Sequence, residues 1–499
     1  MDGPEHAGQF CWMNSATQAS QPLRVRPAGG IVGDWVAGIP GRLFAPVDIS
    51  CLVFLRIVFG AVMLWEVLRY FVNDWIRTDF IEPVIHFTYF GFGWVKPWAG
   101  DGMYVHFAVL GLCAACIMVG FCYRIAAALF FVGFTHVFLI EAAYYLNHFY
   151  LICLLSFLMI FIPCERSLSI DAWRRPELRS DVAPAWTLWL LRAQVGIVYF
   201  YGGVAKINAD WLRGEPMRTW LHDRSDFPVL GAWFHEEWMV YFFVLGGLLL
   251  DLLIVPFLLW RRTRIPAFLA GAAFHLMNAR LFSIGIFPWL MLGALLIFFP
   301  PDTPRRIAVA CGLPWTAAVV PTVGAAATPL SRRQRLIATL LALYMLAQIL
   351  IPLRHFLYPG DVSWTAEGHR FSWRMKLREK HGTAKFTVTD PKSGKNWAVD
   401  LDRYLDSEQR GKMSTNPHMI LQFSHFLADQ KKLQGYDDVE VRVRAMVSLN
   451  GRKEQLLVDP TVDLAKERES LLPLRWIMPL TEPLRKHGSE PEGRSQPAD

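Results

Sequence analysis

The chain has little charge for its length. Of its 499 residues, 19% are Asp, Glu, Lys or Arg, against about a quarter in a typical soluble domain. Hydrophobic residues make up 53%, and the mean hydropathy is +0.27. This deficit predicts a membrane protein with a soluble part attached. The net charge of +7 does not indicate nucleic-acid binding, because Lys and Arg gather between apolar runs, as the positive-inside rule describes.

Cysteine is absent after Cys311, so the C-terminal part of the chain cannot hold a disulfide of its own. The spacing of Cys113, Cys116 and Cys122 is superficially that of a metal motif. However, these residues lie in the apolar run "AVLGLCAACIMVGFC", where thiols are more often small packing residues than ligands. The sequence also lacks a P-loop and a dinucleotide fingerprint, so we expect no metal site and no nucleotide site.

A signal peptide is not evident in the polar segment 1–45, which is rich in Gly and Pro and has no apolar core before a cleavage site. The first apolar run is therefore expected to be a retained anchor. A membrane-crossing helix needs roughly 17–25 residues. Nine runs predict a transmembrane helical domain over 46–355, and the third and seventh of them are short. They lie near 51–72, 105–121, 125–141, 146–164, 186–205, 238–260, 264–279, 282–299 and 336–353.

The charges of the connections predict an orientation. The basic connections are 164–180, 261–264 and 301–335. With nine spans and a cytoplasmic N-terminus, all three lie in the cytoplasm, as the positive-inside rule requires. The opposite loops, 73–104 and 206–237, are rich in Trp and Phe, which is typical of an interfacial belt, although a ring-shaped apolar ligand would use the same residues. An odd number of spans places the C-terminal part outside the cytoplasm.

The character of the sequence changes after residue 355. Alternating apolar and polar residues predict half-buried strands in "AKFTVTD" (384–390), "NWAVDL" (396–401), "VEVRVRAMVSLN" (439–450) and "EQLLVDP" (454–460). The segment 404–434 between them reads as helical. We therefore expect a β-rich α+β extracytoplasmic domain over 356–480, followed by a disordered tail over 481–499.

Three ionisable residues stand inside or at the ends of predicted spans: His148, Lys206 and His275. Such groups are costly in a membrane and suggest function. The predicted topology brings all three to the outer face, beneath the C-terminal domain. Each also has a structural explanation: the lysine can extend to the headgroups, and each histidine can hydrogen-bond a neighbouring helix.

The functional interpretation of Lys206 is chemical. An amine in an apolar, water-poor place is less stable as an ammonium ion, so a neutral amine becomes available. Such a base can deprotonate a weakly acidic substrate near neutral pH. The acids Glu66, Glu141 and Asp251 are either partners inside the bundle or charges at span ends, and the sequence does not decide between these roles.

Several long motifs resemble the vitamin K-dependent gamma-carboxylase family. In the membrane half they are "NHFYL" (147–151), "YFYGGVAKINADWLRGEPM" (199–217), "GGLLLDL" (246–252) and "FHLMNARLFSIGIFPWLML" (274–292). Further on they are "IPLRHFLYPGDVSWTAEGHRFSWRMKLR" (351–378), "VSLNGR" (447–452) and "LLVDPTVDL" (456–464). The resemblance covers roughly residues 45–475 and indicates a bacterial-type member with an HTTM membrane domain, expected in the bacterial inner membrane.

The resemblance implies a reaction and a set of residues. Lys206 would deprotonate reduced vitamin K, as phylloquinol or menaquinol, and dioxygen would convert it to a strongly basic intermediate that ends as the epoxide. That intermediate would take a proton from the γ-carbon of a substrate glutamate, and the carbanion would capture carbon dioxide. His148 and His275 are implied as catalytic residues. The implied quinol-binding residues are Asn147, Tyr199, Trp211 and Asn278.

The sequence departs from the animal members of this family at several places. No cysteine after Cys311 can supply their disulfide between the two domains, Ala205 stands where a second lysine is expected, and Arg378 stands where a histidine is expected. A substrate with a recognition propeptide is therefore not implied. Three hypotheses stay open: a membrane carboxylase and epoxidase, a quinol oxidoreductase without carboxylation, and a non-enzymatic protein that binds a lipid-like ligand.

Overall fold

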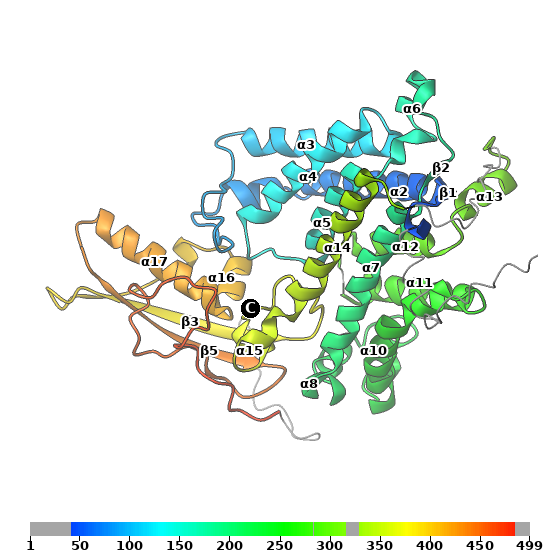
Figure 1. Ribbon diagram of the computed structural model, residues 1–499. Coiled ribbons are helices and arrows are strands. Elements are labelled where there is room, and N and C mark those ends of the chain that lie inside the picture. The colour runs from blue at the N-terminus through cyan, green and yellow to red at the C-terminus, as the bar shows by residue number, and fades with distance from the viewer. Residues whose placement is uncertain (1–40, 283, 316–328, 485–499) are drawn as a thin grey trace, which may run out of the picture.

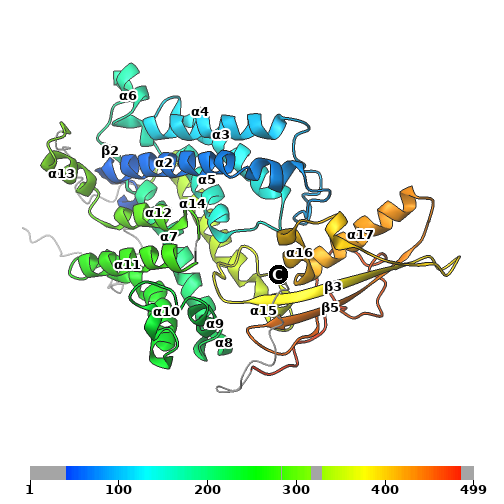
Figure 2. The same cartoon turned by 180° about the vertical axis from the view of Figure 1, so that it is seen from behind.

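The computed structural model describes residues 41–282, 284–315 and 329–484. The polar segment predicted over 1–45 and the tail predicted over 481–499 lie mostly outside the described residues. Figure 1 shows a helical region on one side and, on the other, the domain that contains the strands β3 (Lys380–Thr389) and β5 (Glu440–Leu449). A second view from behind preserves this division (Figure 2).

Seven helices of the described residues are long and apolar enough to cross a membrane. They are α2 (Ser50–Val72), α3 (Gly102–Val119), α4 (Tyr123–Ile140), α7 (Ala185–Lys206), α10 (Glu237–Leu259), α11 (Arg264–Phe282) and α14 (Arg332–Leu353). The third and seventh predicted spans, which the sequence makes short, are the full-length helices α4 and α11. The helical membrane domain is thus confirmed.

The predicted number of nine spans is too high by length. The fourth and eighth runs form shorter apolar helices, α5 (Asn147–Phe161) and α12 (Phe287–Leu295), and a 3-10 turn extends the second to Phe298. The 15 residues of α5 span about 22 Å, less than the hydrocarbon thickness of about 30 Å. The reason lies at its end, where Ile162 is extended before Pro163, as the residue before a proline prefers.

One side of the helical region contacts the C-terminal domain. The backbone N–H of Thr88, in the loop after α2, donates to Gln422 Oε1 at 3.0 Å. The hydroxyl of Tyr144, in the loop after α4, donates to Asp406 Oδ2 at 3.0 Å. The loops after α2 and α4 thus lie on the same side of the bundle, as the predicted topology requires.

The opposite side gathers the other connections. Arg305, after α12, lies 2.9 Å from Asp48, before α2, and 2.9 Å from Asp181, before α7. Arg124 at the start of α4 lies 3.0 Å from Glu165, just after α5. The connections after α5 and α12 therefore share a side with the start of α2, and α5 and α12 run in the directions that the nine-run pattern predicts.

The outward surface of the bundle is apolar. Leucines that are 50–60% exposed follow α14 along its length: Leu336, Leu340, Leu343, Leu346 and Leu350. A large exposed apolar surface is unfavourable in water but suits lipid. The loop between α2 and α3 also exposes Phe90, Trp94 and Trp98. This exposure favours the interfacial belt over a ring-shaped ligand for that stretch.

The C-terminal domain contains a four-stranded antiparallel sheet in the order β4-β3-β5-β6. The strands are β3 (Lys380–Thr389), β4 (Asn396–Ala398), β5 (Glu440–Leu449) and β6 (Gln455–Leu456). Ala384 of β3 faces Ala445 of β5 in the register, and alternate residues of both strands are buried. α16 (Ser407–Ser414) and α17 (Pro417–Leu433) pack against this sheet (Figure 1). All four predicted strands and the helical segment between them are confirmed.

The remaining elements are short. β1 (Pro46–Asp48) pairs with β2 (Val182–Pro184) at the start of the bundle. The other helices are α6 (Ile170–Arg174), α8 (Ala209–Leu212), α9 (Met217–His222), α13 (Thr303–Ala310) and α15 (Val362–Thr365). Residues 366–379, between α15 and β3, form a loop that we call the junction segment.

Candidate functional site

Lys206 is the last residue of α7, and its side chain is buried among the helices. Nζ lies 2.5 Å from Asp251 Oδ2 on α10 and donates to the Gly202 carbonyl at 3.2 Å. Lys206 is 6% exposed and Asp251 is 5% exposed. A lysine that extended to the headgroups would be exposed, so that explanation does not describe this side chain. Lys206 instead has a buried acid as its partner.

Glycines allow α7 and α10 to come this close. A methyl group added at Gly203 would lie 2.7 Å from Leu252 Cδ2, and one at Gly202 would lie 3.1 Å from Asp251 Oδ2. Small residues at a helix interface permit such an approach in membranes. Gly202 therefore leaves the room in which the Lys206 and Asp251 side chains meet.

Trp211 forms one wall of this place. Its indole N–H donates to the Val244 carbonyl at 3.0 Å, and its ring centroid lies 5.4 Å from Lys206 Nζ. The short helix α8 that carries it starts at Asn208, whose side chain accepts from the Trp211 backbone N–H at 3.0 Å. Trp211, an implied quinol-binding residue, thus packs beside the lysine.

The two histidines contact the same aromatic ring. The ring centroid of Phe287, at the start of α12, is 5.6 Å from that of His148 and 5.9 Å from that of His275. His275 Nε2 lies 2.6 Å from the Tyr199 hydroxyl, while within the described residues the buried His275 Nδ1 has no hydrogen-bond partner. Helices α5, α7 and α11 thus each supply one polar group to a mostly aromatic cluster.

Tyr199 links this cluster to the lysine. Tyr199, Gly202 and Lys206 are three and four residues apart on α7, a spacing that puts them on one face of a helix. Tyr199 and Lys206 are separated by about 10 Å along the axis. The structure therefore brings Lys206, His148, His275 and Tyr199 to the domain side of the bundle.

Asn147 connects the bundle to the junction segment. Its side-chain oxygen accepts from the Tyr145 hydroxyl at 3.0 Å, and its Nδ2 lies 3.5 Å from the Arg374 carbonyl. The Tyr145 hydroxyl also accepts from the Phe371 backbone N–H at 2.7 Å. The start of α5 is therefore fixed directly beneath the C-terminal domain.

Met375 of the junction segment lies next to the pair formed by Lys206 and Asp251. A methyl group at Gly202 would lie 3.3 Å from Met375 Cε, as well as 3.1 Å from Asp251 Oδ2. Arg374 beside Asn147 and Met375 beside Gly202 are consecutive, so their Cα atoms are about 3.8 Å apart. The junction segment thus lies over both parts of the candidate site.

Asn278 is one turn beyond His275 on α11 and is half-buried. Within the described residues, no hydrogen bond joins it to the other candidate side chains. Its implied role in quinol binding remains a prediction.

Asp251 and Met375 are site residues that the sequence did not identify. For Asp251 a signal was present: Lys206 stands four residues after Gly202, and Asp251 stands four residues after Gly247. The two helices pack antiparallel, so each charged side chain lies over the glycine of the other helix: Asp251 over Gly202, and Lys206 over Gly247. Small residues at such an interface leave room for the two side chains to meet. For Met375 we find no comparable signal.

The two other undecided acids have structural roles. Glu66 lies 2.5 Å from Arg69 on the same helix. Glu141 accepts from Gln409 Nε2 at 2.9 Å and from the Phe87 backbone N–H at 3.2 Å. The first is a partner within α2, and the second joins the end of α4 to the C-terminal domain.

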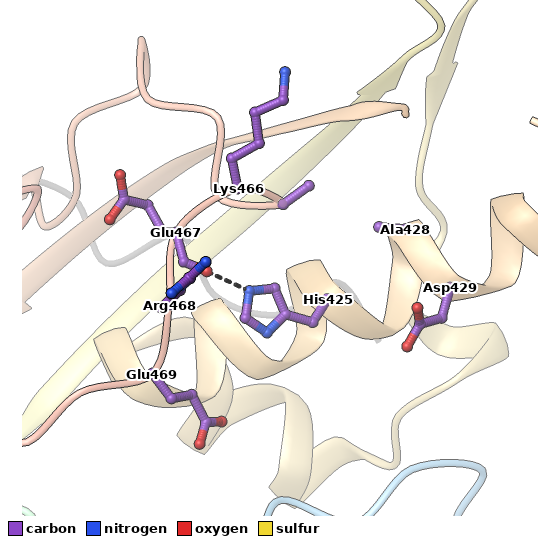
Figure 3. A pocket seen from close by; sticks show the side chains of 8 residues that line it. His425, Ala428, Asp429, Lys466, Glu467, Arg468 and Glu469 are labelled. Atoms are coloured by element: carbon purple, nitrogen blue, oxygen red, sulfur yellow. Dashed lines mark hydrogen bonds between the residues drawn. The ribbon is translucent and has the colours of Figure 1, made fainter. Parts of the chain in front are cut away.

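A surface hollow of about 530 Å³ lies elsewhere, between α17 and the loop 465–469 (Figure 3). His425 Nε2 faces the Glu467 carbonyl there at 2.8 Å. None of the candidate residues lines this hollow. It is not part of the candidate site.

Comparisons with known families match both parts of the chain. The family model described as the HTTM domain matches residues 44–303. The model described as the vitamin K-dependent gamma-carboxylase, lumenal domain, matches residues 333–483. The first match contains Lys206 and Asp251, and the second contains the junction segment. No solved structure matches the chain.

Proposed function

Because the chain belongs to the vitamin K-dependent gamma-carboxylase family of membrane proteins, we propose that it is a carboxylase and epoxidase. It oxidises a vitamin K-type hydroquinone within the membrane and uses the basicity so released to carboxylate a glutamate side chain. The buried pair of Lys206 and Asp251 beneath the junction segment is the observation that carries this proposal.

Lys206 is the proposed base that takes a proton from the quinol hydroxyl. Asp251 holds the amine in place, because its Oδ2 lies 2.5 Å from Nζ. Once Lys206 is protonated, the nearby Asp251 oxygens stabilise the ammonium by a charge-assisted hydrogen bond. Asp251 thus positions the amine and acts through it.

The surrounding residues fit an aromatic, lipid-soluble ring with polar oxygens. Phe287 and Trp211 offer ring faces, and the orphaned Nδ1 of His275 offers a polar atom in a buried place. Asn147, Tyr199 and Asn278 are the further residues proposed to hold the quinol, and His148 is proposed to steady developing charge. When bound, the quinol and dioxygen supply the base that removes the γ-proton of glutamate, and carbon dioxide is the second co-substrate.

Exclusion of water is what the protein itself adds. A strong base survives only where water is kept out, and Met375, Trp211 and the glycine-packed helices surround the lysine pair. We place this site at the outer face of a bacterial inner membrane, with a cytoplasmic N-terminus and an extracytoplasmic C-terminal domain. Quinol then arrives from the lipid and a glutamate-bearing peptide or protein from outside.

A product assay tests the proposal. Purified protein in lipid nanodiscs is incubated with vitamin K hydroquinone, dioxygen, labelled hydrogencarbonate and a glutamate-rich peptide. We expect epoxide together with label in the peptide. Epoxide without label would replace the proposal by a quinol oxidoreductase, and neither product would replace it by a ligand-binding protein.

Variants of the lysine assign the base. Lys206→Ala is expected to abolish epoxide formation, and added small amines to restore part of it, because they supply the missing nitrogen. Lys412→Ala, which removes an exposed lysine of the C-terminal domain, is the matched control and should leave turnover unchanged. Full turnover in Lys206→Ala would rule out the base.

A further inference from the structure

Arg374 in the junction segment is a buried cation without a partner for its charge. Arg374 is 9% exposed, and within the described residues its buried Nε has no hydrogen-bond partner. No carboxylate of these residues forms an ion pair with the guanidinium; the charge of exposed Asp361 acts on it only at longer range. An arginine cannot shed its proton, so burying it unpaired is costly. Binding of an anion would remove that cost.

Other cations crowd the same place. Arg378 Nη1 donates to the Ser363 carbonyl at 3.1 Å, and Lys380 Nζ donates to the next carbonyl, that of Trp364, at 2.7 Å. Both therefore meet at α15, and within the described residues their hydrogen bonds go to neutral backbone oxygens. Burial and then the charges of Arg378, Arg374, Arg370 and Lys380 hold the pKa of His369 well below its usual range, and its buried Nδ1 lacks a partner.

The backbone of the junction segment is strained where it presents these groups. Ala366, Phe371, Trp373 and Lys376 have φ values of 61°, 63°, 54° and 48°. Left-handed conformations are unfavourable for residues other than glycine, and they gather at ligand-binding sites. Phe371 and Trp373 come shortly before Arg374 in the chain. The strained backbone is therefore next to the unpaired cation.

The position of Arg374 relates this cluster to the proposed chemistry. Its carbonyl lies 3.5 Å from Asn147 Nδ2, and the next residue, Met375, lies against Gly202 and Asp251. An anion held by Arg374 would therefore lie about one arginine side chain away from Asn147, on the domain side of the bundle. An acceptor that arrives from outside the membrane has to place its reacting group near these residues.

From this arrangement we propose that Arg374, with Arg378, Lys380 and His369 around it, binds the carboxylate of an acidic peptide acceptor. The inference rests on the proposed function for the identity of the acceptor. Arginine suits the task because its planar fork matches a carboxylate. The excess of cations favours a peptide whose glutamates are clustered over one with a single glutamate.

Binding of a fluorescent peptide with clustered glutamates, measured on the full protein in nanodiscs without quinol or dioxygen, tests this. We expect Arg374→Gln to weaken binding about tenfold or more, a typical loss for a charge-assisted pair. The same peptide with glutamines should bind weakly to both proteins. Because this assay measures binding without turnover, it still tests the role of Arg374 if the proposed enzymatic function is wrong.

Two controls separate the site from general charge and from folding. Arg444→Gln removes one exposed arginine from β5 and should bind like the parent chain. Arg374→Gln should keep or raise the unfolding temperature, since it removes an unpaired buried charge; a merely structural arginine would lower it. Equal affinity of Arg374→Gln and the parent chain would overturn the proposal. Competition by hydrogencarbonate at the affinity of the peptide would instead assign the site to an inorganic ion and overturn the acceptor.

Discussion

Asp210 and Arg452 form a bidentate pair between the two parts of the chain. Both terminal nitrogens of Arg452 donate to the Asp210 carboxylate at 2.7 Å, and Asn450 Nδ2 donates at 2.8 Å. Asp210 belongs to the stretch that follows Lys206, and Asn450 and Arg452 belong to "VSLNGR" after β5. Two motifs that carry the family resemblance therefore meet in one buried contact.

Replacing Asp210 by Asn is expected to destabilise the docked C-terminal domain by about 3–5 kcal/mol, because it leaves Arg452 buried without its charge partner. The measurement is thermal unfolding in nanodiscs at neutral pH. Asp402→Asn, which removes an exposed acid paired with Arg410, should change the unfolding temperature little. Equal effects of the two variants would contradict the buried contact.

The same pair predicts a dependence on pH. Burial works against ionisation of Asp210, but hydrogen bonds from Arg452 and Asn450 and the charge of Arg452 outweigh it and hold the pKa below its usual range. A lowered folded-state pKa stabilises the protein above the unfolded value, about 3.9, and the benefit disappears as the pH falls through the folded value. The stability gap between the parent chain and Asp210→Asn should therefore be constant from neutral pH down to about 5 and shrink below 4.

Asp251→Asn is expected to lower epoxide formation at least tenfold, since the amide cannot balance the charge of the Lys206 ammonium. It should also reduce stability, whereas the double variant Lys206→Met, Asp251→Leu should recover stability without activity. Glu66→Gln, which breaks another buried ion pair, provides the comparison. If it lowers epoxide formation as much as Asp251→Asn does, the loss comes from folding and not from the base.

Gly202→Ala is predicted to impair turnover by steric crowding. The added methyl would lie 3.1 Å from Asp251 Oδ2 and 3.3 Å from Met375 Cε, so one of these groups must move. Gly196→Ala on the same helix would meet Val255 at an ordinary 3.6 Å and should stabilise α7 by about 0.5–1 kcal/mol. Epoxide formation and thermal unfolding are measured for both. Indistinguishable activities would show that the packing at Gly202 is irrelevant to the base.

Tyr199→Phe removes the hydroxyl that contacts His275 Nε2 at 2.6 Å. We expect a several-fold rise in the apparent KM for quinol, because the ring of His275 loses the contact that orients it. Tyr201→Phe removes a hydroxyl that donates to the Ile349 carbonyl of α14, two residues along the same helix. That variant should leave the KM unchanged, and an equal shift in both would remove Tyr199 from the site.

The fold was largely predictable because long apolar runs indicate membrane helices and alternating apolar residues indicate half-buried strands. Each of the nine apolar runs forms a helix, and the strands β3 and β5 follow the alternation in "AKFTVTD" and "VEVRVRAMVSLN". The number of spans was overestimated because run length counts apolar residues, while a helix ends where the backbone turns. For α5 that turn is set by Pro163 and not by polarity.

The site was predictable only in part. The unusual position of Lys206 was visible because a charge in an apolar run is rare, and the topology brought it to the level of His148 and His275. Its partner was left open among Glu66, Glu141 and Asp251, although only Asp251 has a glycine four residues before it, as Lys206 does. The contribution of Arg374 and Met375 depends on left-handed backbone conformations that no periodicity encodes.

The junction segment, which covers Lys206, belongs to a different part of the chain from the helices that surround this lysine. α14 joins the junction segment to the bundle, with the Tyr344 hydroxyl donating to Gln194 of α7 at 2.6 Å. Neither half is consequently expected to carry out the proposed reaction alone: a fragment ending before α14 leaves the amine uncovered, and the fragment beginning there has no amine to cover. Fission of the gene between the two would be tolerated only if the halves found each other again in the bilayer.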